Sequence, residues 1–179
     1  KMGTLNKSFK AYKLLWYGPF HSIEEVEEWQ RKEDIDCCLY LIQGKEPYAK
    51  KYKYYCGQTT RRIVAKRFKD KDHHINEIPN RRSIWIGTFE HRYNDDDRNL
   101  VEKMFIYLIS IFTQEEQCIN KQCLYFPEQE NDVFIVNKWK NPKRNSQPEY
   151  SVKNILPDVI TYFADDDEVK VARKLHIID

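Results

Sequence analysis

The chain of 179 residues has the length of one domain with extensions, since a typical domain holds roughly 100–200 residues. Its composition, 41% hydrophobic, 14% aromatic and 32% charged with a net charge of +2, suffices for a packed interior and excludes a fibrous or disordered chain. No stretch reaches the ~18 apolar residues of a membrane helix, and the polar segment opened by Lys1 is unlike a secretory signal. We therefore expect a globular, cytoplasmic protein with no membrane segment.

The first part of the chain predicts one strand and one helix. Residues 9–20 have the apolar, aromatic composition of a short strand or arm. Ser22 and Glu25 form a capping box that opens a helix to about Arg31.

The next segments alternate between strand and helix patterns. The apolar run 38–42 favours a buried strand, and residues 52–57 favour a second strand antiparallel to it. Thr60 is placed to cap a helix over 61–71, and residues 83–89 predict a third strand.

A polar turn at 94–97 precedes a strongly apolar helix over 98–112. In the tail we expect a strand at 134–136, a linker over 141–148 and a helix over 155–163.

This order predicts an α/β (α+β) fold with a small central antiparallel three-stranded sheet flanked by helices. We assign the sheet and its helices to a core over residues 37–122. An N-terminal extension over 1–36 and a C-terminal extension over 123–179 complete the expected organisation.

The modest net charge conceals two segments of opposite sign. Residues 37–82 contain twelve Lys or Arg and four Asp or Glu, a balance of +8, whereas residues 83–132 contain four and ten, a balance of −6. A basic segment favours phosphate binding, and an acidic one favours a cation site. The alternative for both segments is a solvated charged face.

The cysteines favour no metal site, because they are odd in number and lack the paired C-x-x-C spacing. Reduced thiols are the default for Cys37, Cys38, Cys56, Cys118 and Cys123. A zinc site made from Cys118, Cys123 and the pair His73-His74 is the alternative.

The expected helix over 61–71 carries an arginine within its apolar stripe. Arg67 follows Ile63 by four residues and Val64 by three, so it lies on the face that packs on the sheet, and Lys71 continues this face. An arginine there requires an anion, either a phosphate or a structural carboxylate. In the second helix, Glu102 borders the apolar stripe as a metal ligand or as a first-turn residue that stabilises the helix dipole.

Three motifs in the basic segment point to one family. Cys38-Leu39-Tyr40 resembles the GIY element of the GIY-YIG nuclease superfamily, and Tyr55-Cys56-Gly57 resembles its YIG element. Gly57-Gln58-Thr59-Thr60 leading to Lys66-Arg67-Phe68 is similar to the family's small polar turn and helical arginine. Cys38 and Cys56 depart from the motifs at positions that hold no catalytic side chain in the family.

Two later motifs extend the resemblance to roughly residues 38–121. Leu100-Val101-Glu102-Lys103 is similar to the helix that carries the metal-binding glutamate, and Ile119-Asn120 resembles the late asparagine motif. The sequence of motifs therefore matches the family order, although both extensions remain outside it.

The resemblance implies metal-dependent hydrolysis of DNA phosphodiester bonds by in-line attack of water. Tyr40 would be the general base or its relay, as a phenolate whose pKa is lowered by nearby cations. Glu102 would hold Mg²⁺ or Mn²⁺, and Arg67 would bind the scissile phosphate. The other implied catalytic residues are Tyr55, Lys71 and Asn120.

Some family members have a histidine four residues after the helical arginine, where this chain has Lys71, and the sequence leaves open whether Lys71, His73 or His74 assists catalysis. Arg62, Lys66 and Lys69 form a separate basic face of the same helix. The expected DNA-binding residues are Arg61, Arg62, Lys66, Lys69, His73 and His74.

We expect a site-specific, restriction-like endonuclease, acting as a homodimer if it cuts both strands. The alternatives are a structure-specific or repair GIY-YIG nuclease and a catalytically inactive DNA-binding module.

Overall fold

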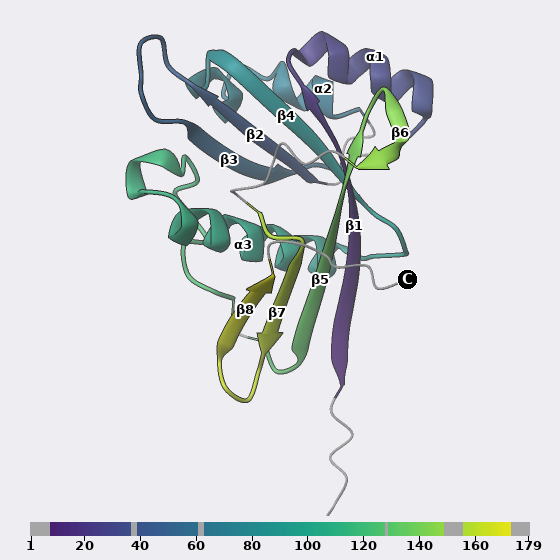
Figure 1. Ribbon diagram of the computed structural model, residues 1–179, viewed down its shortest axis with the longest axis vertical. Coiled ribbons are helices and arrows are strands. Elements are labelled where there is room, and N and C mark those ends of the chain that lie inside the picture. Colours follow the sequence, from purple (N-terminus) through teal and green to yellow (C-terminus); the bar gives the residue numbers. More distant parts are fainter. Residues whose placement is uncertain (1–7, 37–38, 61–62, 128, 149–155, 173–179) are drawn as a thin grey trace, which may run out of the picture.

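The computed structural model describes residues 8–36, 39–60, 63–127, 129–148 and 156–172. Within them the chain forms an eight-stranded sheet, in which seven strands follow the order β3-β2-β4-β1-β5-β7-β8 and β6 pairs with β5 (Figure 1). The strands are β1 (Phe9–Phe20), β2 (Leu39–Lys45), β3 (Lys53–Gln58), β4 (Asn80–Phe89), β5 (Asp132–Asn141), β6 (Arg144–Pro148), β7 (Val159–Phe163) and β8 (Glu168–Ala172). The helices are α1 (Ile23–Glu33), α2 (Val64–Phe68) and α3 (Asp95–Phe112), with 3₁₀ turns η1 (His74–Glu77) and η2 (Glu115–Gln117).

The expected small three-stranded sheet flanked by helices is wrong. The antiparallel strands β3, β2 and β4 are present in that order, but they continue into β1, which pairs antiparallel with β4 and parallel with β5. The larger sheet forms because β1 and β5 bury alternate side chains. A strand buried in this way needs a hydrogen-bonding partner on both of its edges.

The expected helix over 155–163 is also wrong, as is the linker over 141–148. Val159–Phe163 form β7, whose alternate residues Ile160 and Tyr162 are buried, and Arg144–Pro148 form β6. β-Branched and aromatic side chains in β7 fit a pleated, half-buried surface better than a helix. A short apolar run does not distinguish these two states by itself.

The helix expected over 61–71 is shorter in the structure. α2 spans Val64–Phe68, with Ile63 in place of Thr60 as its N-cap and no side-chain cap. By contrast, the caps of the other two helices follow the sequence: Ser22 accepts from the Glu25 amide, and Asn94 and Asp97 form a reciprocal capping box.

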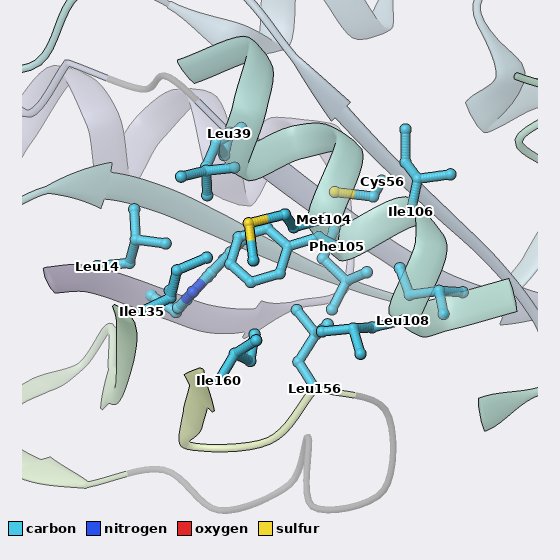
Figure 2. Packing of buried hydrophobic residues seen from close by; sticks show 14 of the residues in the cluster. Leu14, Leu39, Cys56, Met104, Phe105, Ile106, Leu108, Ile135, Leu156 and Ile160 are labelled. Carbon is cyan, nitrogen blue, oxygen red and sulfur yellow. The ribbon is translucent and has the colours of Figure 1, made fainter. Parts of the chain in front are cut away.

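Alternating side chains of the sheet enter two hydrophobic clusters on opposite faces. On one face, Leu39 and Leu41 of β2 pack with α3 and with residues of β1, β5 and β7. Figure 2 shows Met104 and Phe105 of α3 inside this cluster, near Leu14 and Ile135. On the other face, Tyr40 and Ile42 pack with residues of α1, α2 and η1.

In the described part of the chain, no helix combines the length and apolar character that crossing a membrane requires.

Candidate active site at the edge strand

The side chain of Tyr40 lies over Gly57 of β3, the edge strand of the sheet. Tyr40 is paired in register with Gly57 of β3, and its side chain is only 1% exposed. A Cβ atom on Gly57 would lie 2.5 Å from the Tyr40 hydroxyl oxygen, closer than atoms approach. The third residue of the Tyr55-Cys56-Gly57 motif therefore provides the space that the first motif's tyrosine occupies.

His73 contacts the same hydroxyl from the other side. Its Nε2 lies 2.9 Å from the Tyr40 oxygen, and its Nδ1 accepts a hydrogen bond of 3.0 Å from the Ile75 amide. A neutral imidazole has one protonated nitrogen, so an accepting Nδ1 places the proton on Nε2. His73 therefore donates to Tyr40 and cannot accept its proton.

His73 is 2% exposed and remains neutral at physiological pH. Burial, the Arg67 guanidinium and His74 lower its pKa from 6.5 to about 4, whereas Asp70 acts in the opposite direction. The expectation that His73 binds DNA directly does not fit this buried position.

Arg67 pairs with a structural carboxylate, one of the two anion partners considered from the sequence. One terminal nitrogen lies 2.8 Å from the Asp70 carboxylate, and the charge of the guanidinium acts on Tyr40. The Arg67 side chain is nevertheless 41% exposed, so it is half-buried at the surface of the cluster. Asp70 is therefore a structural partner of Arg67, and part of the Arg67 guanidinium remains exposed to solvent.

Burial decides the ionisation of Tyr40. It raises the pKa of the phenol, and Tyr55 adds to this rise, whereas Arg67 lowers the pKa by a smaller amount. The prediction that nearby cations lower the pKa of Tyr40 below its usual value is therefore wrong. The residue is a neutral phenol in the free protein.

Tyr55 packs beside Tyr40 on the same face of the sheet. Its ring centroid lies 6.1 Å from that of Tyr40 and 5.8 Å from that of His73. Burial raises the pKa of Tyr55, and the negative charge of Glu102 raises it further.

Glu102 is held by an amide from the same edge strand. The Gln58 Nε2 donates to Glu102 at 2.7 Å and to Asn99 at 2.6 Å, while the Arg98 Nε donates to the side-chain oxygen Oε1 of Gln58. Burial raises the pKa of Glu102, and Gln58, Arg98 and Lys103 oppose this rise. The carboxylate therefore has a fixed orientation beside the edge of the sheet.

Asn120 is occupied by the backbone of β3. Its amide oxygen accepts from the Cys56 amide at 3.0 Å, and its amide nitrogen donates to the Cys56 carbonyl at 2.8 Å. The Ile119 amide also donates to the Tyr54 carbonyl at 2.9 Å. Asn120 thus orients the site indirectly, by fixing the outer edge of the strand that carries Tyr55.

The lysines expected to act on DNA do not join the cluster: Lys66 and Lys71 are exposed, and Lys69 pairs with Glu27 of α1 at 2.6 Å. His74 borders the cluster, since its ring centroid lies 4.9 Å from that of Tyr55 while its Nδ1 lies 2.5 Å from Glu77. Arg61 and Arg62 lie outside the described residues.

Sequence reasoning did not assign Gln58 and Arg98 to the site. Gln58 directly follows the Tyr55-Cys56-Gly57 motif, but a neutral amide gives no chemical signal of its own. Arg98 precedes Val101 by three residues and Phe105 by seven, and this helical spacing predicts that Arg98 lies on the buried face of α3.

The Glu102 carboxylate suits a cation whose other ligands are mainly water and substrate oxygens. Among the described residues, no three His, Cys, Asp or Glu side chains form a metal-binding group. Glu102 is a single oriented carboxylate, and magnesium commonly uses one or two carboxylates together with waters and substrate phosphates. Glu102 therefore fits Mg²⁺ or Mn²⁺ in the presence of a phosphate ligand.

No family model, curated protein or solved structure matches the chain. The chemistry of the site therefore follows from its own geometry.

The contact between Gly57 and Tyr40 yields a double-mutant test. Gly57→Ala should destabilise the protein by about 1–3 kcal/mol, because the Tyr40 ring has to leave its position. In a Tyr40→Ala background the same substitution should cost much less, since the clashing ring is absent. Urea unfolding of the four proteins measures this coupling, and additive effects would contradict the close contact.

The neutral state of His73 yields a pH test. The unfolded chain protonates His73 near pH 6.5 and the folded chain only near pH 4, so stability that is present above pH 6.5 should fall between these values. The expected loss is up to about 3 kcal/mol. Urea unfolding across this range should show it in the wild type and lack it in His73→Gln. The exposed His91 provides the control, since His91→Gln should leave the pH dependence unchanged.

Proposed function

We propose that this protein is a metal-dependent endonuclease that hydrolyses phosphodiester bonds in DNA. The observation that supports the proposal best is the gathering of Tyr40, Tyr55, Arg67 and His73 at the edge strand β3, whose last residue, Gln58, also holds the carboxylate of Glu102. Hydrolysis of a phosphodiester requires a proton acceptor, positive charge on the phosphate and a cation ligand, and these groups provide all three.

In this mechanism Arg67 binds the scissile phosphate. Asp70 holds one nitrogen of its guanidinium and thereby fixes the plane, while the half-exposed fork faces the substrate. Two parallel hydrogen bonds to phosphate oxygens would stabilise the charge that develops as water attacks phosphorus.

Tyr40 accepts the proton of the attacking water. His73 donates to one lone pair of the Tyr40 oxygen, so the other lone pair can accept the proton of the water, and the proton of Tyr40 itself would pass to the neighbouring Tyr55 hydroxyl. As the new oxygen–phosphorus bond forms and the bond to the leaving oxygen breaks, one proton enters Tyr40 and another passes to Tyr55. Tyr55 releases its own proton to solvent and the leaving oxygen takes up a proton from solvent, so no buried ring carries a full charge.

Glu102 is the proposed ligand of Mg²⁺ or Mn²⁺. When bound there, the ion would neutralise charge on the phosphate and its leaving oxygen. Gln58 holds the carboxylate in place for this purpose. Asn120 and Lys71 have no direct part in these steps.

The proposed substrate is duplex DNA, cut at specific sites by a restriction-like, cytoplasmic enzyme that acts as a homodimer. The second candidate of the same chemistry is a structure-specific or repair nuclease. The candidate of another class is a binding module, which the basic segment 37–82 alone also supports.

Incubation of the purified chain with unmethylated phage DNA separates these functions. With Mg²⁺ we expect discrete bands, and chelation by EDTA should abolish them because Glu102 without a cation repels the phosphate. A smear would indicate a nonspecific nuclease. Intact DNA in Mg²⁺ and in Mn²⁺ would refute cleavage and leave the binding module.

Arg67→Lys tests the role of the guanidinium. Lysine keeps the charge and can keep the pair with Asp70, but it cannot form two parallel hydrogen bonds to a phosphate. Cleavage should fall by on the order of a hundredfold, with melting temperature and DNA affinity nearly unchanged. Lys66→Arg, a head-group exchange on an exposed position of the same helix, should leave cleavage unchanged. Wild-type cleavage by Arg67→Lys would refute the assignment.

A further inference from the structure

The loop between β2 and β3, residues 46–52, presents an exposed aromatic ring on a left-handed backbone. Tyr48 is fully exposed and has φ 66°. A bulky residue in this conformation is strained, and an exposed ring gains nothing from burial. Burial in the fold therefore does not explain why a tyrosine occupies position 48.

Lysines surround this hairpin loop. Lys45, Tyr48 and Lys50 line a hollow of about 570 Å³ together with Asn80. A second hollow of about 350 Å³ on the loop is lined by Lys50, Lys51 and Lys53, with Glu46 and Glu116 among the other lining residues. Glu46, the acidic residue of the loop, pairs with Lys53, so the positive charge of the remaining lysines is uncompensated within the loop.

The hairpin loop also lies apart from the candidate active site. It stands beyond the ends of β2 and β3, at a corner of the molecule (Figure 1). Tyr40 and Lys45 are at opposite ends of β2, five positions apart, which corresponds to ~17 Å along the strand. At 3.4 Å per base pair this distance spans about five base pairs of duplex DNA.

We propose that the hairpin loop is a second DNA-contact surface, in which the sugar–phosphate backbone enters the hollow beside Tyr48. Lys45 and Lys50 bind phosphates, and the Tyr48 ring contacts the sugars and base edges in the groove. The inference rests on the proposed function, because a phosphate at Arg67 sets the register. The bound duplex extends about five base pairs from the scissile phosphate toward the loop.

Binding without cleavage tests this surface. The probe is a fluorescent duplex about three helical turns long, measured by anisotropy in EDTA at several salt concentrations. Lys45→Ala/Lys50→Ala should weaken binding about tenfold or more and reduce the salt slope by about two, one for each lost phosphate contact. The matched control is Lys32→Ala/Lys143→Ala, which removes two exposed lysines beside α1 and should change the affinity by less than about twofold.

Tyr48→Gly separates the ring from the charge. Glycine accepts the left-handed backbone, so a loss of affinity is not a consequence of new strain. We expect binding about threefold weaker or more, with the salt slope unchanged because no charge is removed.

The outcomes separate this inference from the catalytic one. Unchanged affinity in the hairpin variants, or equal losses in the control pair, would overturn the loop as a contact surface. A wild-type chain that binds through the loop but fails to cut in Mg²⁺ would refute the nuclease and support the surface. A chain that binds no duplex at any salt concentration would overturn the surface, and cleavage in Mg²⁺ would then decide on the nuclease separately.

Discussion

The arrangement of the site depends on how closely β2 and β3 approach each other at one register position. Because Gly57 has no side chain, the Tyr40 ring can lie over the edge strand, pack against Phe68 of α2 and place its hydroxyl at His73, the N-cap of η1. Phe68 packs edge-on against the ring with centroids 5.0 Å apart, which fixes its position. A shift of one residue in this pairing would place Tyr40 on the α3 face and dissolve the cluster.

Burial and the direction of hydrogen bonds determine the protonation states in the cluster more than net positive charge does. Arg67 is the permanently charged group among its four residues, and the Asp70 carboxylate offsets that charge. His73 is neutral and serves as a donor, so the direction of proton transfer follows from the Ile75 amide that occupies Nδ1. A backbone amide two residues away thereby determines which side chain can receive the proton of Tyr40.

Local patterns predicted the strands and helices near the site better than the sheet as a whole. The apolar run at 38–42 and the Asn94 cap have local causes, and β2, β3, β4 and α3 occur close to their expected positions. The parallel pairing of β1 with β5 joins residues more than a hundred positions apart, which no local period encodes. For the same reason the sequence suggested cations near Tyr40 but gave no measure of its burial.

The covered outer edge of β3 has a consequence for assembly. An exposed edge strand offers unpaired backbone groups to which a strand of another chain can add. Asn120 and Ile119 occupy these groups at Cys56 and Tyr54. A strand of a second copy therefore cannot add to β3 at these positions without displacing Asn120 and Ile119.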